Sequence, residues 1–100
     1  MLKNVAGQSI GVQMISSTTG DEFTGEITVY VLGDGGTQTL GAVGSGICTH
    51  EGHGFHSYAP SQGETNFDHV AFTFVGTGAI TASLQMYPEI SAVNNRTDVY

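Results

Sequence analysis

The sequence predicts an all-β fold, a single compact antiparallel β-sandwich of about six to eight strands, Ig-like or prealbumin-like, with at most one short helical turn. Three observations support this prediction. Apolar and polar residues alternate at period two in several segments, these segments recur about every ten residues, and glycine-rich turns separate them. A chain of 100 residues, 39% of them hydrophobic, can bury one core, so one domain is expected.

Four segments show the period-two alternation that places every second side chain on the same face of a strand: residues 9–15, 26–32, 69–75 and 79–87. Their inward faces are expected to hold Ile10, Val12, Met14, Ile27, Val29, Val31, Val70, Phe72, Phe74, Ile80, Ala82, Leu84 and Met86. The alternating small and polar residues then form the opposite faces. These four segments therefore supply most of the predicted core.

A glycine-rich turn at residues 33–36 predicts a β-hairpin over residues 30–40, because Gly and Asp accept the positive φ of tight turns. The polar run 37–43 is expected to continue as an extended strand. Pro60 opens the segment best suited to a short helical turn. Within the whole chain, residues 1–6 are predicted to be an N-terminal arm, 7–88 the β-sandwich domain and 89–100 a C-terminal tail.

A second hairpin is predicted around a glycine turn at residues 51–54. Residues 45–49 and 54–59 are its expected strands, with Phe55 and Tyr58 anchoring the second strand in the core. Cys48, the only cysteine, lies in the first of these strands. We therefore expect a buried and inert thiol, because a reactive thiol needs a nearby cation or helix N-terminus.

Three histidines, His50, His53 and His56, lie with Glu51 in a stretch of seven residues in this hairpin, and Asp68-His69 is expected to come near them in the fold. Imidazole and carboxylate groups suit zinc, nickel or iron, so these histidines are the candidate ligands of a structural metal. The alternatives are polar loop histidines near a turn, which we favour, and acid/base catalysis, for which no nucleophile accompanies them. The sequence therefore predicts no firm metal site and no cofactor.

Positive charge is absent from most of the chain, because no lysine or arginine occurs between Asn4 and Asn95. That stretch contains the carboxylates Asp21, Glu22, Glu26, Asp34, Glu51, Glu64, Asp68 and Glu89. With no cation expected inside the folded core, each carboxylate should face water, cap backbone amides, bind a metal or meet a positive group of another chain. Lys3 and Arg96, confined to the two ends, are the residues that this chain has to offer a neighbour.

The net charge of −7 excludes two classes of partner. Nucleic acid is not expected, because binding phosphates requires clustered lysine and arginine. An anionic membrane surface is disfavoured for the same reason. No apolar run approaches the ~20 residues of a membrane span, and no secretory leader opens the sequence, so export by a signal peptide is not expected.

No catalytic residue is predicted, and the chain is expected not to be an enzyme. A Walker loop is ruled out because no lysine is present at such a loop, and no Cys-x-x-Cys pair occurs. The glycine-flanked hydroxyls at residues 44–46 and 76–78 are expected to be turns, since no helix pattern follows them.

Several segments resemble a small β-domain that recurs in the virion proteins of tailed bacteriophages. They are Glu64–Ile80, Cys48–Phe55, Tyr58–Pro60, Val29–Val31 and Gly33–Gln38, and the resemblance covers roughly residues 7–87. Where this module would have a polar turn residue such as Asn, the chain has His53. That departure leaves a metal role for His53 open without implying it.

The resemblance implies a structural virion protein, most similar to a capsid decoration (cement) protein outside the major capsid shell, assembled in the cytoplasm of the host bacterium. The expected partners are the major capsid protein or other virion proteins, and a homo-oligomer, with a trimer suiting three-fold positions. Lys3, Arg96, Val99 and Tyr100 are the candidate interface residues. The alternatives are a neck, baseplate or tail fibre accessory module that binds a host glycan or another tail protein, and a metal-binding domain.

Overall fold

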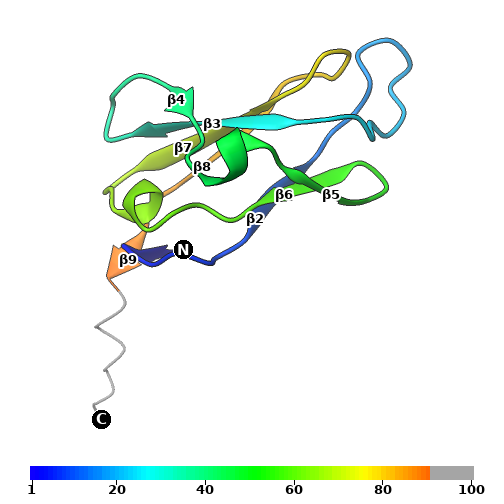
Figure 1. The fold of residues 1–100 in the computed structure, drawn as a ribbon. Helices are drawn as coiled ribbons and strands as arrows, with labels where there is room; N and C mark the ends of the chain where they lie inside the picture. The colour runs from blue at the N-terminus through cyan, green and yellow to red at the C-terminus, as the bar shows by residue number, and fades with distance from the viewer. Residues whose placement is uncertain (91–100) are drawn as a thin grey trace.

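Two antiparallel sheets form the two layers of the domain (Figure 1), in a computed structural model that describes residues 1–90. The first sheet has the order β2-β6-β5, from β2 (Ile10–Gln13), β6 (Phe55–Tyr58) and β5 (Thr49–Gly52). The second has the order β4-β3-β7-β8, from β4 (Thr39–Leu40), β3 (Thr28–Gly33), β7 (Val70–Val75) and β8 (Ala82–Met86). The predicted all-β class is confirmed.

Some details of the predicted fold are different. Residues 1–90 contain two short 3-10 turns instead of one, η1 (Val43–Gly46) and η2 (Gly63–Thr65). A further pair of short strands, β1 (Leu2–Lys3) and β9 (Glu89–Ile90), is parallel and not antiparallel. In the described part of the chain no helix is both long and apolar enough to cross a membrane.

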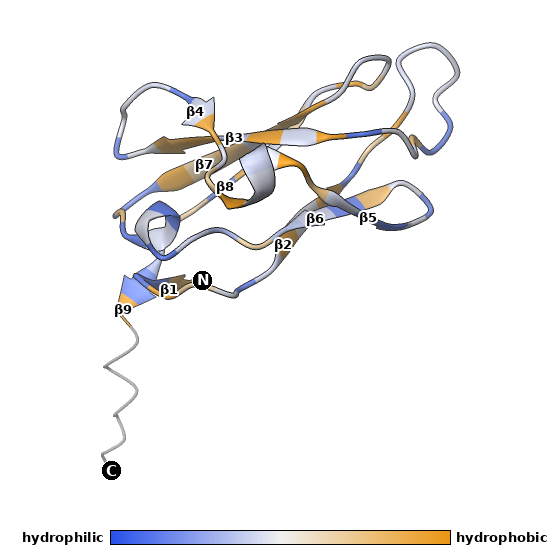
Figure 2. Cartoon of the chain, in the orientation of Figure 1, coloured by the Kyte–Doolittle hydropathy of each residue, from blue (hydrophilic) through white to orange (hydrophobic). Residues whose placement is uncertain are grey.

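The core lies between the two sheets, and its central part was predicted from the alternation. Val29 on β3 and Val70, Phe72 and Phe74 on β7 are fully buried, and β3 and β7 carry much of the hydrophobic colour in Figure 2. The other predicted core residues that are buried or packed against the core are Ile10, Val12, Met14, Ile27, Val31, Ala82, Leu84 and Met86. Ile80 is the exception, because it is 49% exposed. Its amide donates to Ile15 O at 2.9 Å, so the chain at Ile80 pairs with another segment and β8 begins two residues later.

The first predicted hairpin is confirmed, with Tyr30 opposite Leu40 in the register of β3 and β4. Its turn contains Asp34 at φ 50° and Gly35 at φ 76°. The expected extended run to residue 43 is wrong, because β4 ends at Leu40. Gly44, Ser45 and Gly46 follow with φ between 57° and 77°, a left-handed conformation incompatible with a strand, and belong to η1.

The second predicted hairpin is also present, but two of its details are wrong. β5 begins at Thr49 because Ser45 belongs to η1. Tyr58 anchors β6 as expected, at 4% exposure, whereas Phe55 is 41% exposed. The Phe55 ring lies over Gly11 of the neighbouring strand, where an added Cβ would be 2.7 Å from the ring. His56, Ser57 and Tyr58 of this strand are buried, and Phe55 is not.

The N-terminal segment is attached to the domain, although an arm over residues 1–6 was expected. Leu2 and Lys3 pair with Glu89 and Ile90, and the Asn4 amide donates to Thr65 O at 3.2 Å. Of the expected tail over residues 89–100, Glu89 and Ile90 form β9, and the remainder lies outside the described residues.

Candidate functional site

The histidine hairpin was the first candidate site, and the structure places two of its histidines as expected. His50 on β5 and His56 on β6 are directly opposite each other, with ring centroids 4.9 Å apart. Three of their four ring nitrogens, however, already lie within hydrogen-bonding distance of a backbone group. In His56, which is 1% exposed, Nδ1 lies 2.9 Å from Gly54 O and Nε2 lies 3.0 Å from Gly25 O. His50 Nε2 accepts a hydrogen bond from the Gly54 amide at 3.0 Å.

His53 lies in the turn between the two strands. Its side chain is 97% exposed, and Nδ1 is 3.5 Å from Glu22 Oε2. The backbone of His53 has φ 52°, between Gly52 and Gly54, which are also at positive φ. Asn, Asp and His are the non-glycine residues most often found in that conformation, so His53 suits this turn position.

The three histidines are therefore not assembled into one site. Within residues 1–90, no group of three or more His, Cys, Asp and Glu side chains is placed so that it could hold a metal ion. His69 has partners of its own, because its Nε2 lies 2.8 Å from Gln85 Oε1 and its ring lies 5.0 Å from that of Tyr87 at an angle of 41°. The hairpin uses its histidines for hydrogen bonds that hold the β5-β6 turn and its surroundings.

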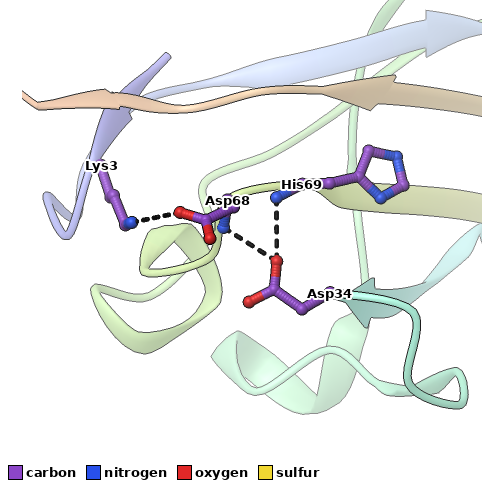
Figure 3. Close-up of polar contacts among 4 residues, drawn as sticks. All are labelled: Lys3, Asp34, Asp68 and His69. Carbon is purple, nitrogen blue, oxygen red and sulfur yellow. Dashed lines mark hydrogen bonds and ion pairs between the residues drawn. The ribbon is translucent and has the colours of Figure 1, made fainter.

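Two carboxylates join the N-terminus, the β3-β4 turn and the start of β7 (Figure 3). Asp34 Oδ1 accepts hydrogen bonds from the amides of Asp68 at 2.9 Å and His69 at 3.0 Å. Asp68 Oδ1 lies 2.7 Å from Lys3 Nζ, and the hydrogen bond and charge of Lys3 lower the pKa of Asp68. The expectation that no carboxylate has a cationic partner within the chain is thus wrong for Asp68. β1 pairing brings Lys3 there from a distant part of the sequence.

Glu64, in η2, has a comparable role and holds the loop that follows β4. Its two carboxylate oxygens accept hydrogen bonds from the Tyr58 hydroxyl at 2.7 Å, the Ser61 amide at 3.0 Å and the Ala42 amide at 2.8 Å. Tyr58 Oη in turn accepts from the Val43 amide at 3.1 Å. Burial raises the pKa of Tyr58 to about 12, so its hydroxyl remains protonated at neutral pH. Glu64 is therefore engaged within the chain and is not a free site for a basic partner.

The remaining reactive groups are also accounted for. Cys48 is buried, and this burial raises the pKa of its thiol to about 11, which makes it a poor nucleophile at neutral pH. Residues 7–11 read Gly-Gln-Ser-Ile-Gly, the letters of a nucleophile elbow that sequence reasoning overlooked. They lead into strand β2, whereas such an elbow joins a strand to a helix, so the match is fortuitous.

The four-stranded sheet has a second side that faces away from the core, which we call the outer face. Residues paired across strands share a side, so the registers assign the outer face to three rows of side chains. The rows are Ile47, Thr28 and Val75; Leu40, Tyr30, Thr73 and Ser83; and Leu32, Ala71 and Gln85. None of these side chains is charged. An open hollow of about 260 Å³ lies on this face, lined by residues 71, 73 and 83–85.

Of the candidate interface residues, Lys3 is paired with Asp68 and its side chain is 27% exposed. Arg96, Val99 and Tyr100 lie outside the described residues. The outer face was not singled out from the sequence, although its signal was present. The polar positions that alternate with the core residues of the strands carry no charge in an otherwise acidic chain.

Comparison with known proteins identifies no relative of this chain. No protein-family model matches the chain, and neither the curated proteins nor the solved structures contain a match.

Proposed function

We propose that this chain is a structural protein of a tailed bacteriophage virion, acting as a capsid decoration (cement) protein on the outside of the major capsid shell. The observation that carries the proposal is the resemblance of residues 48–55 and 64–80 to the virion β-module. The architecture is compatible with that role, because a cement protein acts through its surfaces and needs no reactive side chain.

The polar groups of the described chain support a structural role more than a chemical one. Asp34, Glu64 and His56 all make hydrogen bonds to backbone groups of other segments. Such bonds fix loops in place. The absence of lysine and arginine between Asn4 and Asn95 also removes trypsin sites from the domain, which suits a particle exposed to proteases.

The mode of docking follows from the position of Lys3. Because its ammonium group is already paired at 2.7 Å with Asp68, it has little charge to offer a neighbour. We therefore expect docking to depend on apolar contacts and strand pairing. Added salt should then change the docking affinity only slightly. A strong salt dependence would instead implicate Arg96 or unpaired carboxylates.

The proposal is tested on particles. Capsids that lack the protein should break at lower temperature or lower osmotic stress than complete capsids, and adding the purified protein back should restore them. A fixed number of bound copies per shell is also expected. Capsids of unchanged strength without the protein would contradict a cement role.

The alternative is an accessory module of the neck, baseplate or tail fibre that binds a host glycan or another tail protein. The hollow on the outer face favours this alternative, because Thr73, Ser83 and Gln85 line it with hydroxyl and amide groups that suit a sugar. Antibody labelling of purified virions separates the two proposals, because labelling of tails alone would eliminate the decoration role.

A further inference from the structure

We propose that the outer face of the four-stranded sheet is a self-association surface on which a second copy of this chain packs, face to face, about a two-fold axis. The inference rests on strand register, exposure and charge, and it holds wherever the chain resides in a virion. It names a surface that the proposed function leaves open.

Charge is the first argument. Two copies that each carry a net charge of −7 repel each other, so they can approach closely only where neither presents carboxylates. The outer face satisfies this condition in all three rows. Glu26 precedes β3 and Asp34 follows it, so both lie beyond the rows, and Asp34 is further engaged by two backbone amides. A basic partner would gain nothing from an uncharged face, whereas a second acidic copy would avoid repulsion there.

The other sheet provides a contrast. Thr49 and Ser57 are paired on the outward side of β5 and β6, and Glu51, two residues along β5 from Thr49, hydrogen-bonds to Ser57 with its carboxylate. This places a carboxylate on the outward side of the three-stranded sheet. Two copies packed through that side would bring two carboxylates together, so it is the less suitable surface for self-association.

Exposed apolar groups are the second argument. Leu40 is 46% exposed and Ile47 is 50% exposed, and both lie at the β4 edge of the outer face, next to Tyr30 and Thr28 in register. Tyr30, Leu32 and Val75 add half-buried apolar surface in the same rows. Covering these groups removes apolar area from water without burying a charge.

The expected affinity follows from the size of the face. Strands spaced about 4.8 Å apart and rows spaced about 6.8 Å apart give roughly 33 Å² per position, or about 330 Å² for the ten residues of the three rows. Stable complexes bury about 800 Å² per partner, so this contact is small. We therefore expect weak, reversible dimers in solution that become dominant only at high protein concentration.

The test measures the molecular mass of the full chain by sedimentation equilibrium from about 10 μM to about 1 mM, a range that detects weak association. The wild type should shift from monomer to dimer. Thr73→Glu, at the centre of the middle row, should weaken dimerisation at least tenfold because it places two carboxylates in the contact. Ser83→Glu, on an exposed site of the same row, should weaken it also and guards against misfolding of the first variant.

Thr77→Glu is the matched control, since it adds the same charge at an exposed turn outside the rows. It should leave the dimerisation constant within about twofold of wild type. Added salt removes the general repulsion that the extra charge causes. A wild type that remains monomeric throughout the range overturns the inference. So does an oligomer that Thr73→Glu and Ser83→Glu leave intact while both remain folded. A monomer whose binding to capsids is lost in Thr73→Glu would assign the face to another virion protein, which contradicts self-association but not the proposed function.

Discussion

The two sheets are built on different principles. The four-stranded sheet presents an apolar inner face, with Val29, Phe72 and Phe74 fully buried, and an uncharged outer face. The three-stranded sheet buries His56 and Tyr58 instead, and both make hydrogen bonds to backbone or side-chain groups of other segments. The first sheet is thus held mainly by the removal of apolar surface from water, whereas the second adds directed polar contacts to the apolar packing of Ile10 and Val12 on β2.

This difference teaches where the domain should tolerate change. Apolar packing is insensitive to pH and depends on volume, because a deleted group leaves a cavity. Buried hydrogen bonds depend on both partners being present, because the loss of one leaves the other unsatisfied. Substitutions in the two sheets should therefore differ in size and in their response to pH.

The largest effect is expected from Phe72→Ala on β7. Truncating this fully buried ring should lower the free energy of unfolding by about 3–5 kcal/mol, close to the whole stability of a small domain. Urea denaturation followed by circular dichroism measures the change. Thr73→Ala, the next residue on the outer face, should cost about 1 kcal/mol or less. Equal losses in the two variants would contradict the assignment of inner and outer faces.

His56→Phe should have an intermediate effect in the three-stranded sheet. The new ring has a similar shape but leaves Gly25 O and Gly54 O without the imidazole, so we expect a loss of about 1–3 kcal/mol. The same denaturation measurement applies. His53→Asn is the control, and should change stability by about 0.5 kcal/mol or less, because its side chain is exposed and Asn also accepts positive φ. Wild-type stability of His56→Phe would show that the polar contacts of this sheet are dispensable.

Tyr58→Phe should lower stability by about 1 kcal/mol at neutral pH, because Glu64 loses a donor and the Val43 amide loses an acceptor. Its pH dependence is more specific. The folded pKa of about 12 exceeds the ordinary value of 10.0, so the unfolded chain ionises first as pH rises. The contribution of Tyr58 is therefore intact below pH 10 and lost as pH rises from 10 to 12. Thermal melts across this range should show the loss in wild type and a smaller loss in Tyr58→Phe.

Lys3→Met should have the smallest effect, because Asp68 is fully exposed and its ion pair is screened by water and salt. The pKa of Asp68 is lowered in the folded protein, so the stabilisation is present above the ordinary value of 3.8 and disappears as pH falls below it. Melting temperatures of wild type and Lys3→Met should therefore converge at acid pH and at high salt. A difference that persists at pH 2 would mean that the lysine stem, and not its charge, makes the contribution.

The extent to which the sequence predicted the structure also divides along the two sheets. Alternation over residues 26–32 and 69–75 predicted β3 and β7 with their buried faces, because apolar packing imposes a period of two on the sequence. The same reasoning misplaced Phe55 and His56. Which of them is buried depends on Gly25 O, 31 residues away, and local pattern carries no information about such a partner.

The candidate site shows the same limit. The sequence predicted that carboxylates would cap backbone amides or meet a positive group of another chain. Asp34 and Glu64 do cap amides, whereas Asp68 pairs with Lys3 of its own chain. The sequence did not predict which partner each carboxylate would have, because β1 pairing and loop conformation bring the partners together. Lys3 and Asp68 are 65 residues apart in the chain. The sequence favoured polar histidines near a turn, and His53 does lie in one, but the burial of His56 between Gly54 O and Gly25 O was not predicted.

The parallel pairing of β1 and β9 brings the beginning of the described chain next to its last strand. The Glu89 amide donates to Met1 O at 2.9 Å, so the first residue and the last described strand lie side by side, as Figure 1 shows at the label N. The chain therefore enters β1 and reaches the end of β9 within two strand positions of each other. The module is therefore suited to insertion into a surface loop of a larger protein, and to circular permutation with new ends opened at the turn of residues 76–78.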